Sequence, residues 1–269
     1  MNAPKEVAEE DADQSGYHHP KHVRGLPHLP FVRDYLLPDP GQLWGKRDYS
    51  QQEFRILAHY EDGALLKLFK ANPNMDVHVL VASLIFAKPM SDVTKDERGI
   101  AKTIGFGLLY GLGVPKLAAK LKRSEDEARD LKGQYMRALP GIKGLQDGIK
   151  SLVRADQPIC TWGGREYYCE PPKEERGWMR TFEYKLLNYL IQGSAADCTK
   201  QAIINYHEHP KRKARFLLTV HDEINASMPP KRLAEEMKVL EESMLDVDFG
   251  VPMLSDGKAG PCWGQLSKA

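Results

Sequence analysis

The sequence has few cysteines, no long apolar run and almost no net charge, and each shortage excludes a class of protein. Its 269 residues include four cysteines, which lie far apart without a CxxC pair, so neither a zinc site nor a disulfide framework is expected. No apolar stretch is long enough to span a membrane, and the N-terminus lacks the basic-then-apolar pattern of a secretory signal. A net charge of +1 does not by itself indicate a polyanionic partner. These absences predict a globular, cytoplasmic protein without a membrane partner.

What is present predicts strands near both ends of the chain and helices between them. Residues 1–16 are acidic and aperiodic, which is typical of a disordered tail. The sequence pattern places helices over 51–72, 76–87, 94–111, 116–138, 180–206 and 231–245, a strand over 42–50, hairpins over 157–170 and 215–230, and an irregular segment after 245. A sheet built from such distant pieces indicates an α+β fold.

One predicted helix carries an unusual row of side chains. Thr94–Gly111 reads TKDERGIAKTIGFGLLYG and begins with a Thr-x-x-Glu capping box. Arg98, Lys102, Phe106 and Tyr110, here called the stripe, recur at every fourth position and share one broad face. Aliphatic neighbours supply a second face for the core, so the stripe is left to contact a ligand with a phosphate end and a flat end, as in a nucleotide. The plainer alternative is a surface helix with solvated cations and inward-packed rings.

Two acidic residues end or join predicted strands. Asp48 lies near the end of the predicted strand QLWGKRDYS, and RFLLTVHDEINASMPP predicts a hairpin with its turn at Asp222–Glu223 and a strongly apolar, central first strand. Neighbouring strands of one sheet could therefore carry Asp48 and Asp222, although such acids are more often caps or turn formers. Two carboxylates suit Mg²⁺, which takes few protein ligands, water and substrate phosphates. A pair of such ions can stabilise both oxygens of a phosphoryl transfer.

Together these stretches resemble the polymerase motifs of family A DNA polymerases, the bacterial DNA polymerase I type that is also common in phages. DYSQQEFR from Asp48 is similar to the first motif, R-x3-K-x3-F-x3-YG from Arg98 to the second, and VHDE from Val220 to the third. The similarity runs from about Leu29 to Leu266. It implies a palm with an antiparallel sheet and helices, and mainly helical fingers.

The resemblance also implies a division of the chain. The palm would comprise 17–60 and 185–269, and the fingers 61–184, with the stripe on the helix at 94–111. Neither a thumb nor an exonuclease domain is expected, since few residues precede Asp48. The thumb and exonuclease could then sit on a separate chain, as in a split polymerase.

Each position that matches the family's motifs inherits a role. Asp48 and Asp222 would bind two Mg²⁺ ions, which Mn²⁺ can replace, with the Tyr49 carbonyl as a further ligand and Glu223 as an auxiliary catalytic residue. The incoming dNTP would contact Arg98, Lys102, Phe106, Tyr110, Glu53, His78 and Gln51. Primer-template DNA would contact His221, Gln192, Asn188, Arg55 and Lys185.

Some of these roles are chemically specific. Glu53 would be the steric gate that excludes a ribose 2′-hydroxyl. Lys102 would also protonate the leaving pyrophosphate, which makes it a catalytic residue. Asn188 and Gln192 would contact minor-groove acceptors that all base pairs share.

Two positions depart from the family's pattern. Tyr184 stands where the family usually has an arginine that contacts DNA, and Gly105 replaces a more typical polar residue, which should loosen the helix. The implied function is a template-directed DNA polymerase core. The alternatives are a non-catalytic DNA-binding or replisome-assembly subunit that retains the fold, and a metal-dependent nuclease or other phosphohydrolase, in which the stripe would have no task.

Overall fold

The computed structural model describes residues 32–175 and 177–269, so the tail expected at 1–16 lies outside the described residues. The chain divides into two compact units. Of the described residues, the first unit, here the sheet unit, comprises 32–49, Ala202–Asp246 and Ser255–Ala269, and the second, here the helical unit, comprises 50–175, 177–201 and Val247–Leu254. Across the part of the chain that the structure describes, no helix combines the length and apolar character needed to cross a membrane.

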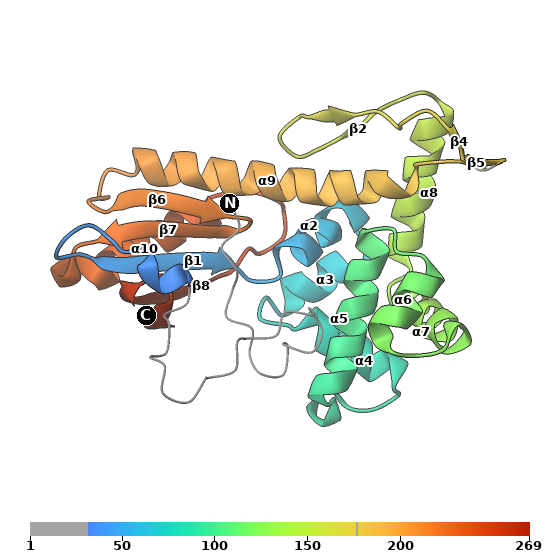
Figure 1. Ribbon diagram of the computed structural model, residues 1–269, viewed down its shortest axis with the longest axis horizontal. Coiled ribbons are helices and arrows are strands. Elements are labelled where there is room, and N and C mark those ends of the chain that lie inside the picture. The colour runs from blue at the N-terminus through green and yellow to red at the C-terminus, as the bar shows by residue number, and fades with distance from the viewer. Residues whose placement is uncertain (1–31, 176) are drawn as a thin grey trace, which may run out of the picture. The chain divides into compact units, whose positions relative to one another are not determined.

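The sheet unit is built around a five-stranded antiparallel sheet with the strand order β6-β7-β1-β8-β9 (Figure 1). Its elements are η1 Val32–Tyr35, β1 Leu43–Tyr49, β6 Arg215–Val220, β7 Glu223–Met228, η3 Pro230–Arg232, α10 Leu233–Leu245, β8 Ser255–Cys262 and β9 Gln265–Lys268. The expected sheet of sequence-distant pieces is confirmed, because β1 pairs with β7 and β8 from the other end of the chain.

Strand β1 has two distinct faces, as alternation along a strand requires. The Tyr49 hydroxyl donates to the Met244 carbonyl of α10 at 2.6 Å, so one face packs on that helix. On the other face, the Trp44 indole N–H donates to the Asn225 side chain of β7 at 2.8 Å. Asp48 shares the parity of Trp44 and therefore belongs to the face opposite α10.

Two expectations about the sheet are wrong. The segment after α10, expected to be irregular, forms β8 and β9. Gly260 allows this pairing, because a Cβ at that position would lie 1.8 Å from the Gln265 carbonyl oxygen. The apolar strand β6, expected to be central, lies at one end of the strand order, whereas β7 lies inside it and is buried at every residue.

The helical unit consists of helices and two short hairpins. Its elements are α2 Gln52–Glu61, α3 Ala64–Ala71, α4 Val77–Ile85, η2 Met90–Asp92, α5 Lys95–Leu109, α6 Val114–Leu121, α7 Glu125–Ala138, α8 Gly141–Arg154, β2 Ile159–Cys160, β3 Glu166–Tyr167, β4 Lys173–Glu175, β5 Trp178–Arg180 and most of α9 Tyr184–Glu208. The helices expected over 51–72 and 116–138 are each divided in two. Helix α8, whose N-cap is Pro140, lies between the helix expected to end at 138 and the hairpin expected from 157, and it was not predicted.

Helix α5 forms as its sequence predicts. The Glu97 amide donates to the Thr94 hydroxyl at 3.2 Å, and the Thr94 amide donates to the Glu97 carboxylate at 2.9 Å, which confirms the capping box. Gly105 lies on the buried face of this helix, where a Cβ would lie 2.4 Å from the Tyr135 hydroxyl and 2.8 Å from the Phe54 ring. The missing side chain therefore allows close packing of α5 on its neighbours.

Candidate active site

The structure brings the two predicted aspartates of the sheet unit together through the backbone. Asp48 is the penultimate residue of β1 and stands opposite Glu223 in β7, the residue that follows Asp222. The Tyr49 amide donates to the Asp222 carbonyl at 3.3 Å. Asp48 and Asp222 are both partly exposed. Two carboxylates thus lie on adjacent strand ends whose spacing is fixed by main-chain pairing.

The hairpin turn lies one residue earlier than expected, at His221–Asp222, because Glu223 pairs with Val220 and begins β7. His221 has a φ of 54°, and Asp222 does not have a positive φ. A two-residue turn with positive φ at its first central position is of type II′, where glycine is the usual residue. A histidine with this backbone conformation costs about 1 kcal/mol or more. The turn therefore carries backbone strain that a glycine would relieve.

Glu223 is buried and saturated with hydrogen bonds. Its carboxylate accepts from the Lys46 ammonium, from the Asn225 amide at 3.0 Å and from the Trp263 indole at 2.9 Å. Burial alone would raise the pKa of this carboxyl, but the hydrogen bond and charge of Lys46 hold it below the ordinary value. Glu223 is therefore committed to holding β1 and β7 together, and the structure does not support a catalytic role by direct contact.

The sheet unit offers two carboxylates and one main-chain carbonyl as possible ligands for a metal ion. In residues 32–175 and 177–269, no three His, Cys, Asp or Glu side chains are grouped to hold an ion. A site of two carboxylates and the Tyr49 carbonyl needs no such group, because Mg²⁺ keeps several waters and binds substrate phosphates as well. Asp48 and Asp222, partly exposed and on adjacent strand ends, fit that requirement.

In the helical unit, the stripe lies on the accessible side of α5. Lys102 and Tyr110 are exposed and Arg98 and Phe106 half-buried, whereas Ala101, Ile104, Gly105, Gly107, Leu108 and Leu109 are buried. The prediction of two faces is confirmed. The Phe106 ring lies 5.8 Å from that of Tyr110 and packs edge-on against Phe54 at 5.4 Å. Cations at one end and rings at the other therefore share one open surface.

Tyr110 ends α5 and joins it to α2. Its hydroxyl lies 3.2 Å from both carboxylate oxygens of Glu53, and the Gln192 amide donates to the same carboxylate at 3.4 Å. Burial, together with the charge of Glu53, raises the pKa of Tyr110 to about 12. The phenol is therefore protonated at neutral pH and acts as a donor that orients Glu53.

Residues expected to contact the nucleotide from α4 and the start of α2 have other partners. His78 is 3% exposed and lies against Phe54 at 4.8 Å, and burial lowers its pKa to about 4. The Gln51 amide donates to the Met75 carbonyl at 2.9 Å and accepts from the Val77 amide at 3.0 Å. Both side chains position α4, so in this structure neither is presented as a ligand contact.

The structure contradicts the expected role of Arg55. It was expected to contact DNA, yet it is 0% exposed, and its guanidinium donates to the carbonyls of Ser50, Pro73 and Pro252. Burial lowers its pKa to about 10, so it remains charged at neutral pH. Arg55 therefore organises the core of the helical unit and cannot reach DNA from this position.

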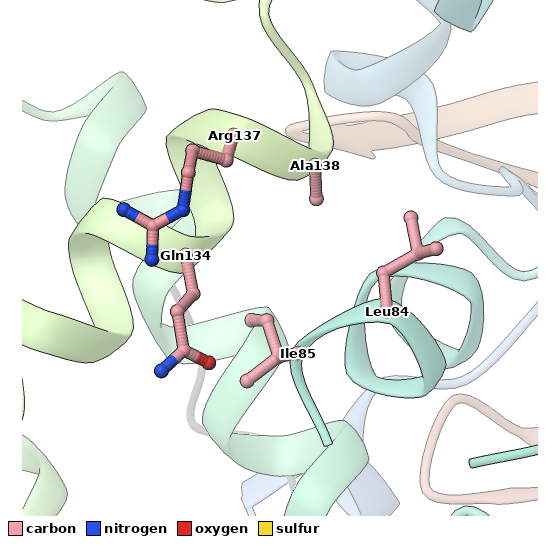
Figure 2. Close-up of a pocket in the computed structure, with 5 residues that line it drawn as sticks. All are labelled: Leu84, Ile85, Gln134, Arg137 and Ala138. Atoms are coloured by element: carbon pink, nitrogen blue, oxygen red, sulfur yellow. The ribbon is translucent and has the colours of Figure 1, made fainter. Parts of the chain in front are cut away.

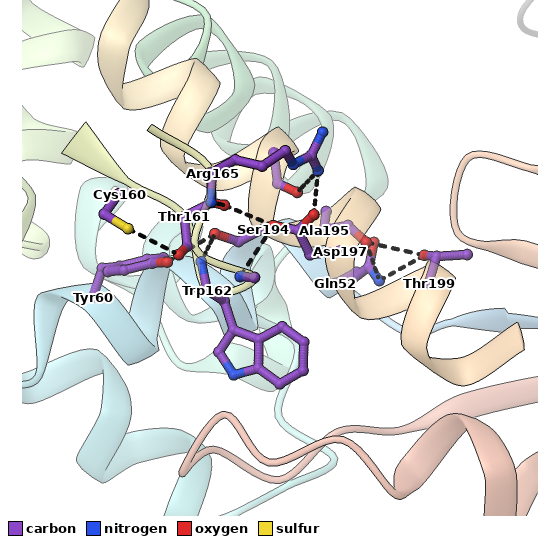
Figure 3. A network of polar contacts seen from close by, with 12 residues as sticks. Gln52, Tyr60, Cys160, Thr161, Trp162, Arg165, Ser194, Ala195, Asp197 and Thr199 are labelled. Carbon is purple, nitrogen blue, oxygen red and sulfur yellow. Dashed lines mark hydrogen bonds and ion pairs between the residues drawn. The ribbon is translucent and has the colours of Figure 1, made fainter. Parts of the chain in front are cut away.

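A polar network that the sequence did not reveal ties the loop between β2 and β3 to α9 (Figure 3). The Asp197 carboxylate accepts from the Thr161 hydroxyl at 2.7 Å, from the Gly163 amide at 3.1 Å and from the Arg165 guanidinium. Gly163 and Gly193 allow the approach, because a Cβ on either would clash with the facing element. The network fixes the segment of α9 that carries Gln192.

The remaining predicted DNA contacts lie on the N-terminal half of α9. Asn188 is half-buried and Gln192 exposed, one turn apart on the same helix. Lys185 donates to the Glu170 carboxylate at 2.7 Å and lies over the Phe182 ring at 4.5 Å. Tyr184, at the position where an arginine was expected, accepts from Arg180 at 3.1 Å.

An open hollow of about 590 Å³ between α4 and α7 is not part of this chemistry (Figure 2). Its lining consists of Leu84, Ile85, Gln134, Arg137 and Ala138. It includes none of the stripe residues and no carboxylate, so we do not assign the site to it.

Comparison with known proteins agrees with this geometry. Residues 28–265 match the family described as DNA polymerase family A. The chain is 32% identical over 242 residues to DNA polymerase I of Chloroflexus aurantiacus, covering 88% of this chain and 26% of the relative. It is 33% identical over 239 residues to DNA polymerase I of Geobacillus stearothermophilus, covering 86% and 27%.

A solved structure extends the comparison to the fold. The POL domain of Pol1 from M. smegmatis, in complex with DNA primer-template and dNTP, superposes with a TM-score of 0.78 at 30% identity, covering 90% of this chain and 44% of that one. The expected α+β fold, with an antiparallel sheet and mainly helical fingers, is thereby confirmed. The chain spans about a quarter of the length of the bacterial relatives named above.

Proposed function

Because the chain belongs to DNA polymerase family A, we propose that it is the core of a template-directed DNA polymerase, which adds dNTPs to a primer 3′ end. The observation that carries the proposal is the main-chain pairing that sets Asp48 beside Asp222. The open stripe on α5 supports it independently, since cations followed by rings suit a nucleotide.

Asp48, Asp222 and the Tyr49 carbonyl would hold two Mg²⁺ ions, or Mn²⁺ in their place. When bound, the ions supply Lewis-acid stabilisation of the charge that develops on the reacting oxygens. The two aspartates would contribute by holding the ions on a rigid sheet, since β1, which carries Asp48, is paired with β7, which directly follows Asp222. Glu223 keeps those strands in register and takes no direct part.

The stripe would bind the incoming nucleotide. Arg98 and Lys102 would hold the triphosphate, Phe106 would stack against base and sugar, and Tyr110 would lie toward the template. Glu53, oriented by Tyr110 and Gln192, would fill the space that a ribose 2′-hydroxyl needs. Discrimination against ribonucleotides would then arise from exclusion.

Primer-template DNA would contact residues outside the stripe. His221, in its strained turn, would meet the primer terminus, and Asn188 and Gln192 would contact minor-groove acceptors. Lys185 would reach DNA after release from Glu170. The proposal includes a separate chain that carries thumb and exonuclease elements, as in a split polymerase.

The reaction follows from these roles. The primer 3′-hydroxyl loses its proton to solvent as its oxygen attacks the α-phosphorus in line, an O–P bond forms, the bond from the α-phosphorus to the bridging oxygen breaks and pyrophosphate leaves. Lys102, which is exposed on α5, would give a proton to that pyrophosphate. Positioning and electrostatic stabilisation carry the catalysis, as is general for phosphoryl transfer.

A primer-extension assay tests the proposal. The purified full-length chain should extend a labelled primer-template with Mg²⁺ and dNTPs, and Asp222→Ala should lower the rate by about a thousandfold or more. Asp126→Ala, which changes an exposed acid of α7, should extend like the wild type and melt at the same temperature. Tight primer-template binding without extension at any protein concentration would favour the non-catalytic DNA-binding subunit instead.

A further inference from the structure

The carboxylate of Asp76, just before α4, has two separate partners. One oxygen, Oδ1, accepts from the backbone amides of His78 at 2.9 Å and Val79 at 3.2 Å, which makes Asp76 the N-cap of the helix. The other oxygen, Oδ2, accepts from Nε of Arg98 at 2.8 Å. A single side chain therefore fixes the start of α4 and also holds the first cation of the stripe.

The contact uses a particular edge of the arginine. A guanidinium is planar and presents donors along two edges, and Asp76 takes the Nε donor. The terminal amino groups of Arg98 donate to no other residue among those the structure describes, and its side chain is 40% exposed. Since Nε is engaged, the fork formed by these two amino groups is the edge that can still bind a phosphate in bidentate geometry.

Asp76 is itself held in place. The residues on either side of it, Met75 and Val77, are bound by the side chain of Gln51 through a carbonyl at 2.9 Å and an amide at 3.0 Å. Burial would raise the pKa of Asp76, but its bonds to Arg98 and to the Val79 amide keep the pKa below the ordinary value. The carboxylate is charged at neutral pH and cannot follow a mobile arginine; the arginine must conform to it.

The exposure of the Asp76–Arg98 pair indicates that the contact orients the Arg98 side chain more than it stabilises the fold. Ion pairs between side chains that are about a third exposed contribute little to stability, because water screens them and both side chains lose freedom. A contact with so small an effect on folding can still have a large effect on orientation, since arginine has many rotamers to lose when it binds a phosphate. Fixing the side chain beforehand removes that loss from the binding step.

We propose that Asp76 is a positioning residue that presents the free fork of Arg98 to the triphosphate of the incoming nucleotide. The inference rests on the proposed function, in which Arg98 binds that triphosphate. Asp76 does not touch the substrate. It acts through Arg98 and, by way of its second oxygen, couples the orientation of the stripe to the capped end of α4.

Steady-state incorporation of a single dGTP opposite a template cytosine tests the inference with the full-length chain. Asp76→Asn retains a good N-cap but removes the charge that holds Arg98. We expect the KM for dGTP to rise about tenfold, with the melting temperature, the Kd for primer-template and kcat nearly unchanged. The matched control is Asp126→Asn, which breaks the Asp126–Arg129 pair near the start of α7 and should change none of these values.

A double-mutant cycle separates orientation from general loosening. If Asp76 acts through Arg98, then Asp76→Asn should have no further effect on KM in an Arg98→Ala background. Additive effects would overturn the inference, as would a wild-type KM in Asp76→Asn. Asp76→Ala, which also loses the cap, should raise KM similarly and in addition lower the melting temperature.

The outcome remains distinguishable from failure of the proposed function. If the wild-type chain does not extend primers, isothermal titration with dGTP alone still compares the wild type with Asp76→Asn, and we expect about tenfold weaker binding by the variant. Equal affinity in that titration overturns the role of Asp76. If the wild type neither extends primers nor binds dGTP, both proposals are wrong.

Discussion

The two units hold their functional groups in different ways. In the sheet unit, Asp48 and Asp222 stand beside Glu223, whose buried carboxylate is saturated by hydrogen bonds. In the helical unit, Lys102 of the stripe is exposed, and Arg98, whose side chain is 40% exposed, is held by one partly exposed ion pair. We infer that the residues around the two aspartates serve both stability and function, whereas the cations of the stripe serve function and contribute little to stability. Four substitutions or conditions test it, in order of their expected effect on the free energy of unfolding.

The largest loss of stability is expected from Glu223→Leu. The substitution leaves the Lys46 ammonium without its buried partner, and that side chain is 11% exposed. Breaking a buried pair in this way costs about 3–5 kcal/mol. Urea denaturation measures the loss, and Glu175→Leu, which breaks an exposed pair with Arg180, is the control and should cost less than about 1 kcal/mol. A loss below 1 kcal/mol in Glu223→Leu would contradict the importance of the buried network.

Acid should destabilise the helical unit through His78. Burial lowers the pKa of His78 from 6.5 to about 4, so the unfolded chain binds the proton more readily between these values. Stability from this group is complete above pH 6.5 and falls as the pH drops toward 4, by at most about 3 kcal/mol. The charges that bear on the ring are Asp76, Arg98 and Lys102, and of these Asp76 has a lowered pKa and stays ionised over most of this range.

The measurement is urea unfolding of the wild type and His78→Gln from pH 7.5 to 4.5. The glutamine is neutral throughout, so the difference in stability between the two proteins should shrink as the pH falls. A difference that is constant across this range would mean that His78 is not buried as a neutral ring.

Gly105→Ala should have a smaller effect of the same sign. The new methyl group would meet the Tyr135 hydroxyl and the Phe54 ring, and such overpacking costs about 1–3 kcal/mol, offset in part by the better helix propensity of alanine. Gly99→Ala on the same helix is the matched control, because nothing lies within 4 Å of its Cβ position. We expect that control to gain up to about 1 kcal/mol. Thermal unfolding distinguishes the two, and equal stabilisation by both would contradict the packing described for Gly105.

The smallest effect on stability is expected from Lys102→Ala. Its side chain is exposed, so the free energy of unfolding should change by less than about 0.5 kcal/mol. Single-nucleotide incorporation should nevertheless fall by about a hundredfold, if Lys102 binds and protonates the pyrophosphate. Lys95→Ala in the first turn of α5 should change neither quantity. A Lys102 variant that is unstable but fully active would reverse the comparison between the units.

The elements that depend on residues close together in the sequence could be predicted from the sequence. The capping box at Thr94 and Glu97 fixes the start of α5, and the spacing of the stripe fixes its faces, so both were predictable from the sequence. Strand β1 and the hairpin around Asp222 follow from alternation and turn residues. The position of the turn was predicted one residue late, since Asp222 belongs to both candidate turns, His221–Asp222 and Asp222–Glu223, and only the pairing of Glu223 with Val220 decides between them.

The remainder depended on partners that are distant in sequence. Arg55 reads as an exposed cation until Pro73 and Pro252 supply the carbonyls that allow its burial. The glycines in the segment after α10 favour a prediction of irregular structure. In the fold, however, the close approach of the Gln265 carbonyl to the main chain of β8 requires a glycine at position 260. Asp76 carries an ordinary cap signal, and its contact with Arg98, twenty-two residues away, appears only in the folded structure.

The hydrogen bond from the Tyr49 amide to the Asp222 carbonyl has a consequence for how accurately the site is built. Positional error accumulates with each dihedral angle between two groups, and this bond leaves few dihedral angles between the paired main chain and the two carboxylates. Changes in loop length elsewhere in the chain would therefore leave the relative position of the two carboxylates unchanged. A one-residue slip of β7 would destroy this arrangement, because it turns every side chain of that strand to the opposite face. The register of the sheet therefore sets the distance between the two carboxylates, and this distance can change only in steps of one residue.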